Sequence, residues 1–236
     1  MKFGAADIGG VYYSIASTFT QLADKEIDGY TFETKTTAGS VANLRLISDG
    51  YIDLAIVQAD LLSDAYNGKG TFKDGDYKKG YKAVAALYTE VCQIIVKSAS
   101  GIETIDDLVG KTVSIGAAES GTEKNAEEIL KVSGITEELV KTVNMDYSEA
   151  VDKLIAGEID AMFITSGIRT GMNLAYLITD KSKKMQAYSF TAGALGFTGN
   201  MALIKAGQYL IMSVWAYGEA IMDMRDSVSY THLTLP

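Results

Sequence analysis

Small and hydroxyl-bearing residues gather at three points where a short β-branched run is followed by a helical pattern. These junctions span residues 9–14, 36–40 and 117–122. The first turn of a helix has free backbone N–H groups and about half a positive charge, which suit a carboxylate or a phosphate. In open α/β sheets, ligands bind at the carboxyl ends of the strands. The junctions therefore indicate a site for a small anion, but each serine is equally suited to capping its own helix.

The candidate ligand-binding residues lie in these junctions or at the end of a neighbouring strand. They are Gly10, Tyr12, Tyr13, Ser14, Ser40, Gln58, Ser120, Gly121 and Thr122. We expect at least one of the two adjacent tyrosines to pack in the core and the other to cover an apolar part of the ligand. The amide of Gln58 suits either a ligand or a neighbouring loop.

Nucleotide-binding motifs do not fit these junctions. Gly9-Gly10 lacks the third glycine of a dinucleotide fingerprint. The segment 116–122 has the length of a P-loop, but Thr122 stands where the phosphate-binding lysine is required. We therefore expect no nucleotide cofactor.

Side chains suited to catalysis are scarce. The only histidine, His232, lies with the only proline in residues 227–236, which have no apolar period and which we interpret as a non-native tail. Without that histidine, histidine-based triads and histidine metal sites are excluded. The single cysteine, Cys92, lies in an apolar run and is expected in the core. Adjacent carboxylates such as Asp106-Asp107 point to different faces of a helix. The sequence favours a binding protein over an enzyme, with no metal and no cofactor.

The composition of the chain excludes several classes of binding partner. The chain has 236 residues, of which 47% are hydrophobic and 22% charged, as in an ordinary globular protein. Its formal net charge of −9 disfavours nucleic acid and anionic membrane surfaces as partners. The longest uncharged stretch, 185–204, contains too many polar residues and glycines for a membrane span. The expected partner is a small ligand, and the junctions suit one that carries a carboxylate or a phosphate.

The elements that must position the junctions alternate between strand and helix. The expected strands are 2–7, 30–37, 53–57, 82–87, 90–97, 112–116, 140–143 and 159–165. The expected helices are 11–25, 40–50, a short one at 104–107, 120–132, 146–156 and 210–224. This repetition predicts an α/β protein with a parallel or mixed sheet and helices on both faces.

A repeated four-residue pattern supports two similar α/β lobes. Gly50-Tyr51-Ile52-Asp53 recurs as Gly157-Glu158-Ile159-Asp160, in each case at the end of a helix and the start of a strand. We expect residues 1–89 and about 186–226 to form lobe I and residues 90–185 to form lobe II, with the chain crossing between them near residues 84–96.

Six motifs follow one another in the first 170 residues. They are Gly9-Gly10-Val11-Tyr12-Tyr13, residues 37–44 (TAGSVANL), residues 53–60 (DLAIVQAD), Ala65-Tyr66-Asn67-Gly68, residues 116–122 (GAAESGT) and Asp160-Ala161-Met162-Phe163. In this order they resemble the TAXI family, the extracytoplasmic solute receptors of tripartite ATP-independent periplasmic (TRAP) transporters.

The resemblance implies a type II periplasmic-binding-protein fold, in which two α/β lobes close around a small solute. That solute is commonly a carboxylate such as glutamate or glutamine, delivered to the TRAP membrane permease from a periplasmic or extracytoplasmic location. The chain departs from the family in its missing export signal, its shorter length and its faint match after Thr170, which a truncated gene product would explain. Two alternatives remain: a binding protein of the same fold for an ABC importer, and a small-molecule enzyme on an α/β scaffold.

Overall fold

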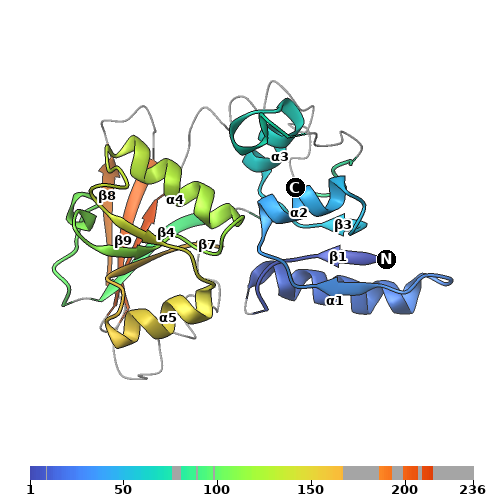
Figure 1. The fold of residues 1–236 in the computed structure, drawn as a ribbon. Helices are drawn as coiled ribbons and strands as arrows, with labels where there is room; N and C mark the ends of the chain where they lie inside the picture. The colour runs from blue at the N-terminus through green and yellow to red at the C-terminus, as the bar shows by residue number, and fades with distance from the viewer. Residues whose placement is uncertain are drawn as a thin grey trace.

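The described strands of the computed structural model form two separate sheets, each with its own helices (Figure 1). The described residues are 1–8, 10–75, 81–88, 90–97, 99–166, 186–192, 199–206 and 209–214. One sheet has three strands in the order β2-β1-β3, and the other has seven in the order β6-β5-β7-β4-β10-β9-β8. We call the two parts the three-stranded lobe and the seven-stranded lobe.

The three-stranded lobe is a run of strand–helix units. Its elements are β1 (Lys2–Gly4), α1 (Val11–Glu26), β2 (Glu33–Lys35), α2 (Ser40–Ser48), β3 (Leu54–Ala55), α3 (Ala59–Asn67) and the 3-10 turn η1 (Gly70–Phe72). Strand β1 pairs in parallel with both β2 and β3. Parallel neighbours need a crossover between them, and α1 and α2 supply the two crossovers.

Buried side chains fix these helices on the small sheet. Phe3 and Ala5 pack with Ala16 of α1 in one core cluster, whereas α2 and α3 pack on each other through a second cluster that includes Leu44. The fully buried Asn43 of α2 donates through Nδ2 to the carbonyl of Ala5 at 2.6 Å and to that of Ile56 at 2.8 Å. This side chain therefore ties together the chain just beyond β1 and just beyond β3.

The seven-stranded lobe has a mixed sheet. Its elements are β4 (Val91–Lys97), the 3-10 turn η2 (Asp106–Leu108), β5 (Thr112–Ser114), α4 (Gly121–Val132), β6 (Lys141–Val143), α5 (Tyr147–Ala156), β7 (Ala161–Ser166), β8 (Gln186–Ala192), β9 (Gly199–Ala206) and β10 (Tyr209–Val214). Strand β5 is parallel to β6 and β7, while β4 is antiparallel to β7 and β10. Strand β9 is antiparallel to β10 and β8.

Alternation along β4 places a helix on each face of this sheet. Ile94 and Val96 belong to the core cluster that contains Leu130 of α4, whereas Ile95 belongs to the cluster that contains Leu154 of α5. Successive side chains of a strand point to opposite faces, so an uninterrupted apolar run is what a strand covered on both sides requires. Figure 1 shows α4 and α5 on either side of the strands.

Three expectations differ from the structure. Residues 82–87 form no strand: they are exposed, Val84 by 85%, and no described strand pairs with them. Residues 210–214, expected at the start of the helix 210–224, belong to β10, because pairing with β4 and β9 overrides local preference. Finally, β8, β9 and β10 extend the sheet of β4, whereas we expected residues 186–226 to return to the first lobe. The tail at 227–236 lies outside the described residues. No helix in the described part of the chain has the length and hydropathy needed to cross a bilayer.

Candidate ligand site between the lobes

The turns that precede α2 and α4 lie against each other, although they belong to different lobes. A Cβ atom on Gly39 would lie 3.4 Å from the Cα and Cβ atoms of Ser120. The backbone N–H of Ala42 donates to the carbonyl of Glu119 at 3.2 Å. The structure thus brings together two of the three junctions that the sequence singled out.

The two serines of these turns have different partners. Ser120 is the N-cap of α4, and its Oγ accepts the backbone N–H of Glu123 at 3.0 Å, as a capping box predicts. Ser40 is not a cap, contrary to the sequence prediction. Gly39 holds the N-cap position of α2, so Ser40 is already helical, and its Oγ accepts the backbone N–H of Gln58 at 3.0 Å.

Gln58 reaches across to the other lobe. It is the N-cap of α3, and its Nε2 donates to Oδ1 of Asn125 on α4 at 3.0 Å. A Cβ atom on Gly121 would lie only 2.3 Å from Oε1 of Gln58, so this approach requires a glycine at that position. The same Oε1 is buried and has no hydrogen-bond partner among the described residues.

The predicted residues of α1 divide into two groups. Tyr12 and Tyr13 both pack against the core cluster beneath α1, and the Tyr12 hydroxyl also donates to Oε2 of Glu90 at 2.7 Å. Gly10 is buried and is the N-cap of α1. Ser14 is exposed, and its hydroxyl donates to the carbonyl of Gly10 at 3.3 Å, within its own helix. The described hydrogen bonds of Ser14 stay within α1 and its N-cap, and none reaches the turns before α2 and α4.

Thr122 belongs to a second group of hydroxyls on the seven-stranded lobe. Its Oγ1 lies 2.5 Å from the Tyr147 hydroxyl, which is also 3.2 Å from both the backbone nitrogen and the carbonyl of Thr165. The Thr165 hydroxyl donates to Oδ1 of Asn125 at 3.0 Å, the atom that also accepts from Gln58. Through Asn125, this group is continuous with the contact between the lobes.

Two carboxyl groups that the sequence reading missed lie at this contact. Burial raises the pKa of Asp60, although the amide of Asn125, 3.4 Å from its Oδ2, opposes the shift. Burial also raises the pKa of Glu90, against hydrogen bonds from Tyr12, Tyr88 and Gln58 that lower it. None of the ion pairs between described residues involves either carboxyl group.

Signals for the missed residues were present but weak. Asn125 is four residues after Gly121, and therefore on the same face of α4. Glu90 is a charged residue directly before an apolar strand, at the predicted crossing between the lobes. Neither position belongs to a recognisable motif, because the partners that place them at this contact, Tyr12 for Glu90 and Gln58 for Asn125, are more than sixty residues away in sequence.

An ion pair adds to the contact at its edge. Nη2 of Arg45 on α2 lies 2.5 Å from Oε2 of Glu119, with the two side chains 44% and 47% exposed. Glu119 has a φ of +64°, in the left-handed region. Its own N–H donates to Oε2 of Glu123 at 2.9 Å, so the turn before α4 is bonded on both sides.

Cys92 lies near this site, but its thiol is unreactive. Burial raises the pKa of its thiol to about 12, so it is protonated at neutral pH. This agrees with the prediction of a core cysteine. In the described part of the chain, no group of three His, Cys, Asp or Glu side chains is placed to bind a metal.

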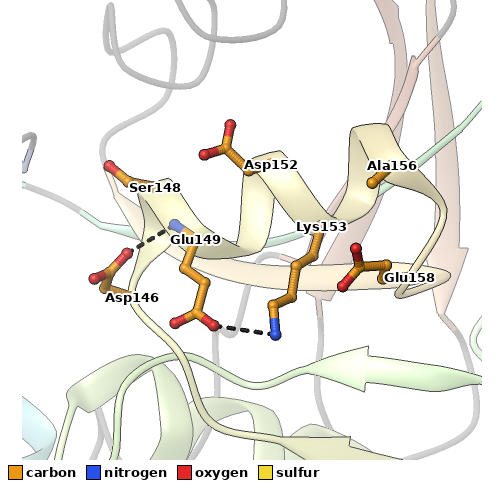
Figure 2. Close-up of a pocket in the computed structure, with 7 residues that line it drawn as sticks. All are labelled: Asp146, Ser148, Glu149, Asp152, Lys153, Ala156 and Glu158. Atoms are coloured by element: carbon orange, nitrogen blue, oxygen red, sulfur yellow. Dashed lines mark hydrogen bonds and ion pairs between the residues drawn. The ribbon is translucent and has the colours of Figure 1, made fainter.

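An open hollow of about 500 Å³ lies along α5, away from the predicted residues (Figure 2). It is lined by Asp146, Ser148, Glu149, Asp152, Lys153, Ala156 and Glu158. Its one cation, Lys153, is paired with Glu149 at 3.1 Å within the helix. This arrangement is that of a solvated acidic helix face, and none of the candidate ligand-binding residues lines it.

Two α/β lobes in contact through polar turns at strand-to-helix junctions define a type II periplasmic-binding-protein fold, as the sequence predicted. Residues 3–207 match the NMT1-like family, so the chain belongs to that family.

Two solved structures agree with this fold class. A putative L-cystine ABC transporter protein from Listeria monocytogenes superposes with a TM-score of 0.51 at 16% identity, covering 96% of this chain and 90% of that one. An ancestral arginine-binding protein bound to arginine gives 0.50 at 18% identity, with coverages of 96% and 92%. The alkanesulfonate-binding protein SsuA from Xanthomonas axonopodis pv. citri gives a TM-score of 0.48 at 18% identity. The match covers 70% of this chain and only 53% of the length of SsuA. At these identities the likeness concerns the fold alone.

Proposed function

We propose that this chain is a solute-binding receptor that holds a small carboxylate solute between its lobes and releases it to a membrane transporter. The observation that supports this most directly is the buried Oε1 of Gln58, which has no described partner at the contact of the two lobes. A buried polar atom without a partner is costly, by about 1–3 kcal/mol. A ligand with an N–H or O–H group that replaces the direct contact between the lobes would supply the missing bond.

The proposed binding residues are those whose polar atoms lie at this contact. They are Tyr12, Ser40, Gln58, Ser120, Gly121 and Thr122, to which the geometry adds Asn125. Gly10 and Tyr13 would support the site from behind, as the N-cap and a packed ring of α1. Ser14, exposed on α1, has the weakest support.

The transporter that receives the solute has two candidates. The motif resemblance to TAXI proteins supports a TRAP permease driven by an ion gradient. The fold is equally that of proteins named for amino-acid ABC transport, so an ABC importer fits at least as well. Either partner places the protein outside the cytoplasm. Uptake in reconstituted vesicles, driven by an ion gradient or by ATP, separates the two.

A binding screen tests the proposal. Thermal melting of the chain is measured with the twenty amino acids and with common mono- and dicarboxylates, followed by titration calorimetry. A true ligand at a hundred times its Kd stabilises the fold by about 2.7 kcal/mol. Gln58→Leu should abolish this stabilisation, whereas the matched control Gln21→Leu, on the exposed side of α1, should retain it. Turnover of a bound compound, or stabilisation that survives in Gln58→Leu, would contradict the proposal.

A further inference from the structure

The side chain of Asn125 on α4 is at the centre of a chain of hydrogen bonds that joins the two lobes. Its Oδ1 accepts from Nε2 of Gln58 at 3.0 Å and from the Thr165 hydroxyl at 3.0 Å. Its Nδ2 lies 3.4 Å from Oδ2 of Asp60, at the start of α3. An amide oxygen accepts two hydrogen bonds and an amide nitrogen only donates. Both ends of the Asn125 amide therefore face partners of the opposite kind.

Asp60 determines which way round the Asn125 amide lies. An ionised carboxyl group accepts hydrogen bonds and donates none, so it takes the amide nitrogen and repels the amide oxygen. Burial raises the pKa of Asp60, while backbone N–H groups at the start of α3 and the Asn125 amide oppose this shift. The helix dipole likewise favours a negative charge in this first turn. With Nδ2 of Asn125 bound to Asp60, its Oδ1 is the end that faces Gln58.

The Gln58 amide must then meet Asn125 with its nitrogen. The opposite orientation would place Oε1 of Gln58 against Oδ1 of Asn125, which are both acceptors. Glu90 acts in the same sense, because it also accepts a hydrogen bond from the Gln58 side chain. Oε1 is the end of the amide that is left over. It is buried without a hydrogen-bond partner among the described residues, beside the Cα atom of Gly121.

We propose that Asp60 is a positioning residue, which acts through Asn125 to keep the oxygen of the Gln58 amide, and not its nitrogen, available to a solute. A glutamine that could turn over would accept from one solute and donate to another. Fixed in this way, it selects solutes that bring an N–H or O–H group to this point and disfavours those that bring only an acceptor. The statement about solutes rests on the proposed function, whereas the orientation of the two amides does not.

Hydrogen exchange of side-chain amides tests the orientation without any ligand. Nuclear magnetic resonance on the full, isotope-labelled chain follows the Nε2 hydrogens of Gln58, whose signal is identified by its loss in Gln58→Leu. We expect them to exchange about tenfold more slowly than those of the exposed Gln21. Asp60→Ala should speed the exchange at Gln58 by about two- to tenfold, the range for one hydrogen bond. The matched control Asp64→Ala, on the same helix, should not. An unchanged rate in Asp60→Ala would overturn the proposal.

A swap of the amide and carboxyl groups separates positioning from packing, and serves also if Asp60→Ala does not fold. Asn125→Asp alone sets two carboxyl groups against each other and should lower the melting temperature by about 4 °C or more. Adding Asp60→Asn again places a donor against an acceptor, and the carboxyl group at position 125 still accepts from Gln58. We expect the melting temperature and the slow exchange at Gln58 both to return. Recovery of the melting temperature alone would indicate only relief of charge repulsion and would refute the proposal. Neither measurement uses a ligand, so its failure is distinct from a failure of the binding screen.

Discussion

The turns before α2 and α4 are alike in composition and lie against each other, yet each uses its glycine and its serine differently. In the first turn, the glycine has a φ of +123° and a ψ of −150°, and the serine binds the distant backbone of Gln58. In the second turn, the serine caps its own helix, and the glycine makes room for the side chain of Gln58. The difference shows that a glycine in one turn can be needed for its backbone conformation, whereas a glycine in a similar turn can be needed to admit a side chain from the other lobe.

The largest effect should come from Gly39→Ala. The backbone conformation of this residue is almost restricted to glycine, so alanine should lower the free energy of unfolding by about 1–3 kcal/mol. Urea denaturation of the variant and of the parent chain measures the difference. A loss below about 0.5 kcal/mol, the usual range for surface changes, would mean that the turn before α2 accommodates a side chain. Gly39 would then not be needed for backbone conformation, and it would not differ from Gly121 in that respect.

The two serines should also differ, and the loss of stability should be no larger than that for Gly39→Ala. Ser40→Ala leaves the Gln58 N–H without its acceptor, which should cost about 1–3 kcal/mol of stability. It should also weaken ligand binding by shifting Gln58.

Ser120→Ala removes the cap of α4 and should cost about 1 kcal/mol of stability, and it should lower ligand affinity less than Ser40→Ala does. Denaturation and calorimetry on both variants provide the comparison. The reverse order of effects on affinity would show that the cap, and not the bridge to Gln58, holds the site.

The ion pair at the edge of the contact should contribute less. A double-mutant cycle with Arg45→Gln and Glu119→Gln should give a coupling energy of about 0–1 kcal/mol, because both side chains are half exposed. The pair Lys153–Glu149 on α5 is the control, since it joins residues of one helix. Added ligand should change the first coupling energy and leave the second as it was. If both respond equally, the Arg45–Glu119 pair does not report on the lobe contact.

The smallest effect on stability should come from Gly121→Ala. The clash is with the end of a flexible side chain, and alanine favours the helix by up to about 1 kcal/mol, so melting should hardly change. Affinity for the ligand should nevertheless fall, because Gln58 is displaced. Combining Gly121→Ala with Gln58→Ala should then lower affinity no further than Gln58→Ala alone. Additive losses would indicate that Gly121 acts independently of Gln58.

Local patterns predicted much of this fold up to residue 166. The capping box of Ser120 and Glu123 was readable because donor and acceptor are three residues apart. The alternation of strands and helices was readable because each buries a periodic face. Ser40 was misread as a cap because its true partner, the backbone of Gln58, is eighteen residues away.

Contacts between distant segments were not predictable from one sequence. Leu210 and Met212 suit a helix or a strand, and pairing with β4 makes them strand residues. The acidic character of the site was missed for the same reason. Asp60 and Glu90 look like ordinary charges in the sequence until the fold buries them, and burial raises the pKa of each carboxyl group.

The buried thiol of Cys92 can report how often the larger sheet opens. It is the chain's one cysteine, it lies on β4 in the middle of the larger sheet, and its raised pKa suppresses reaction in the closed state. Modification by a thiol reagent must therefore wait for the sheet around it to come apart, so the labelling rate counts opening events directly. A second cysteine placed on the surface would be labelled at once. One sample would then show fast labelling of that cysteine and slow labelling of Cys92, whose rate reports the opening of the core.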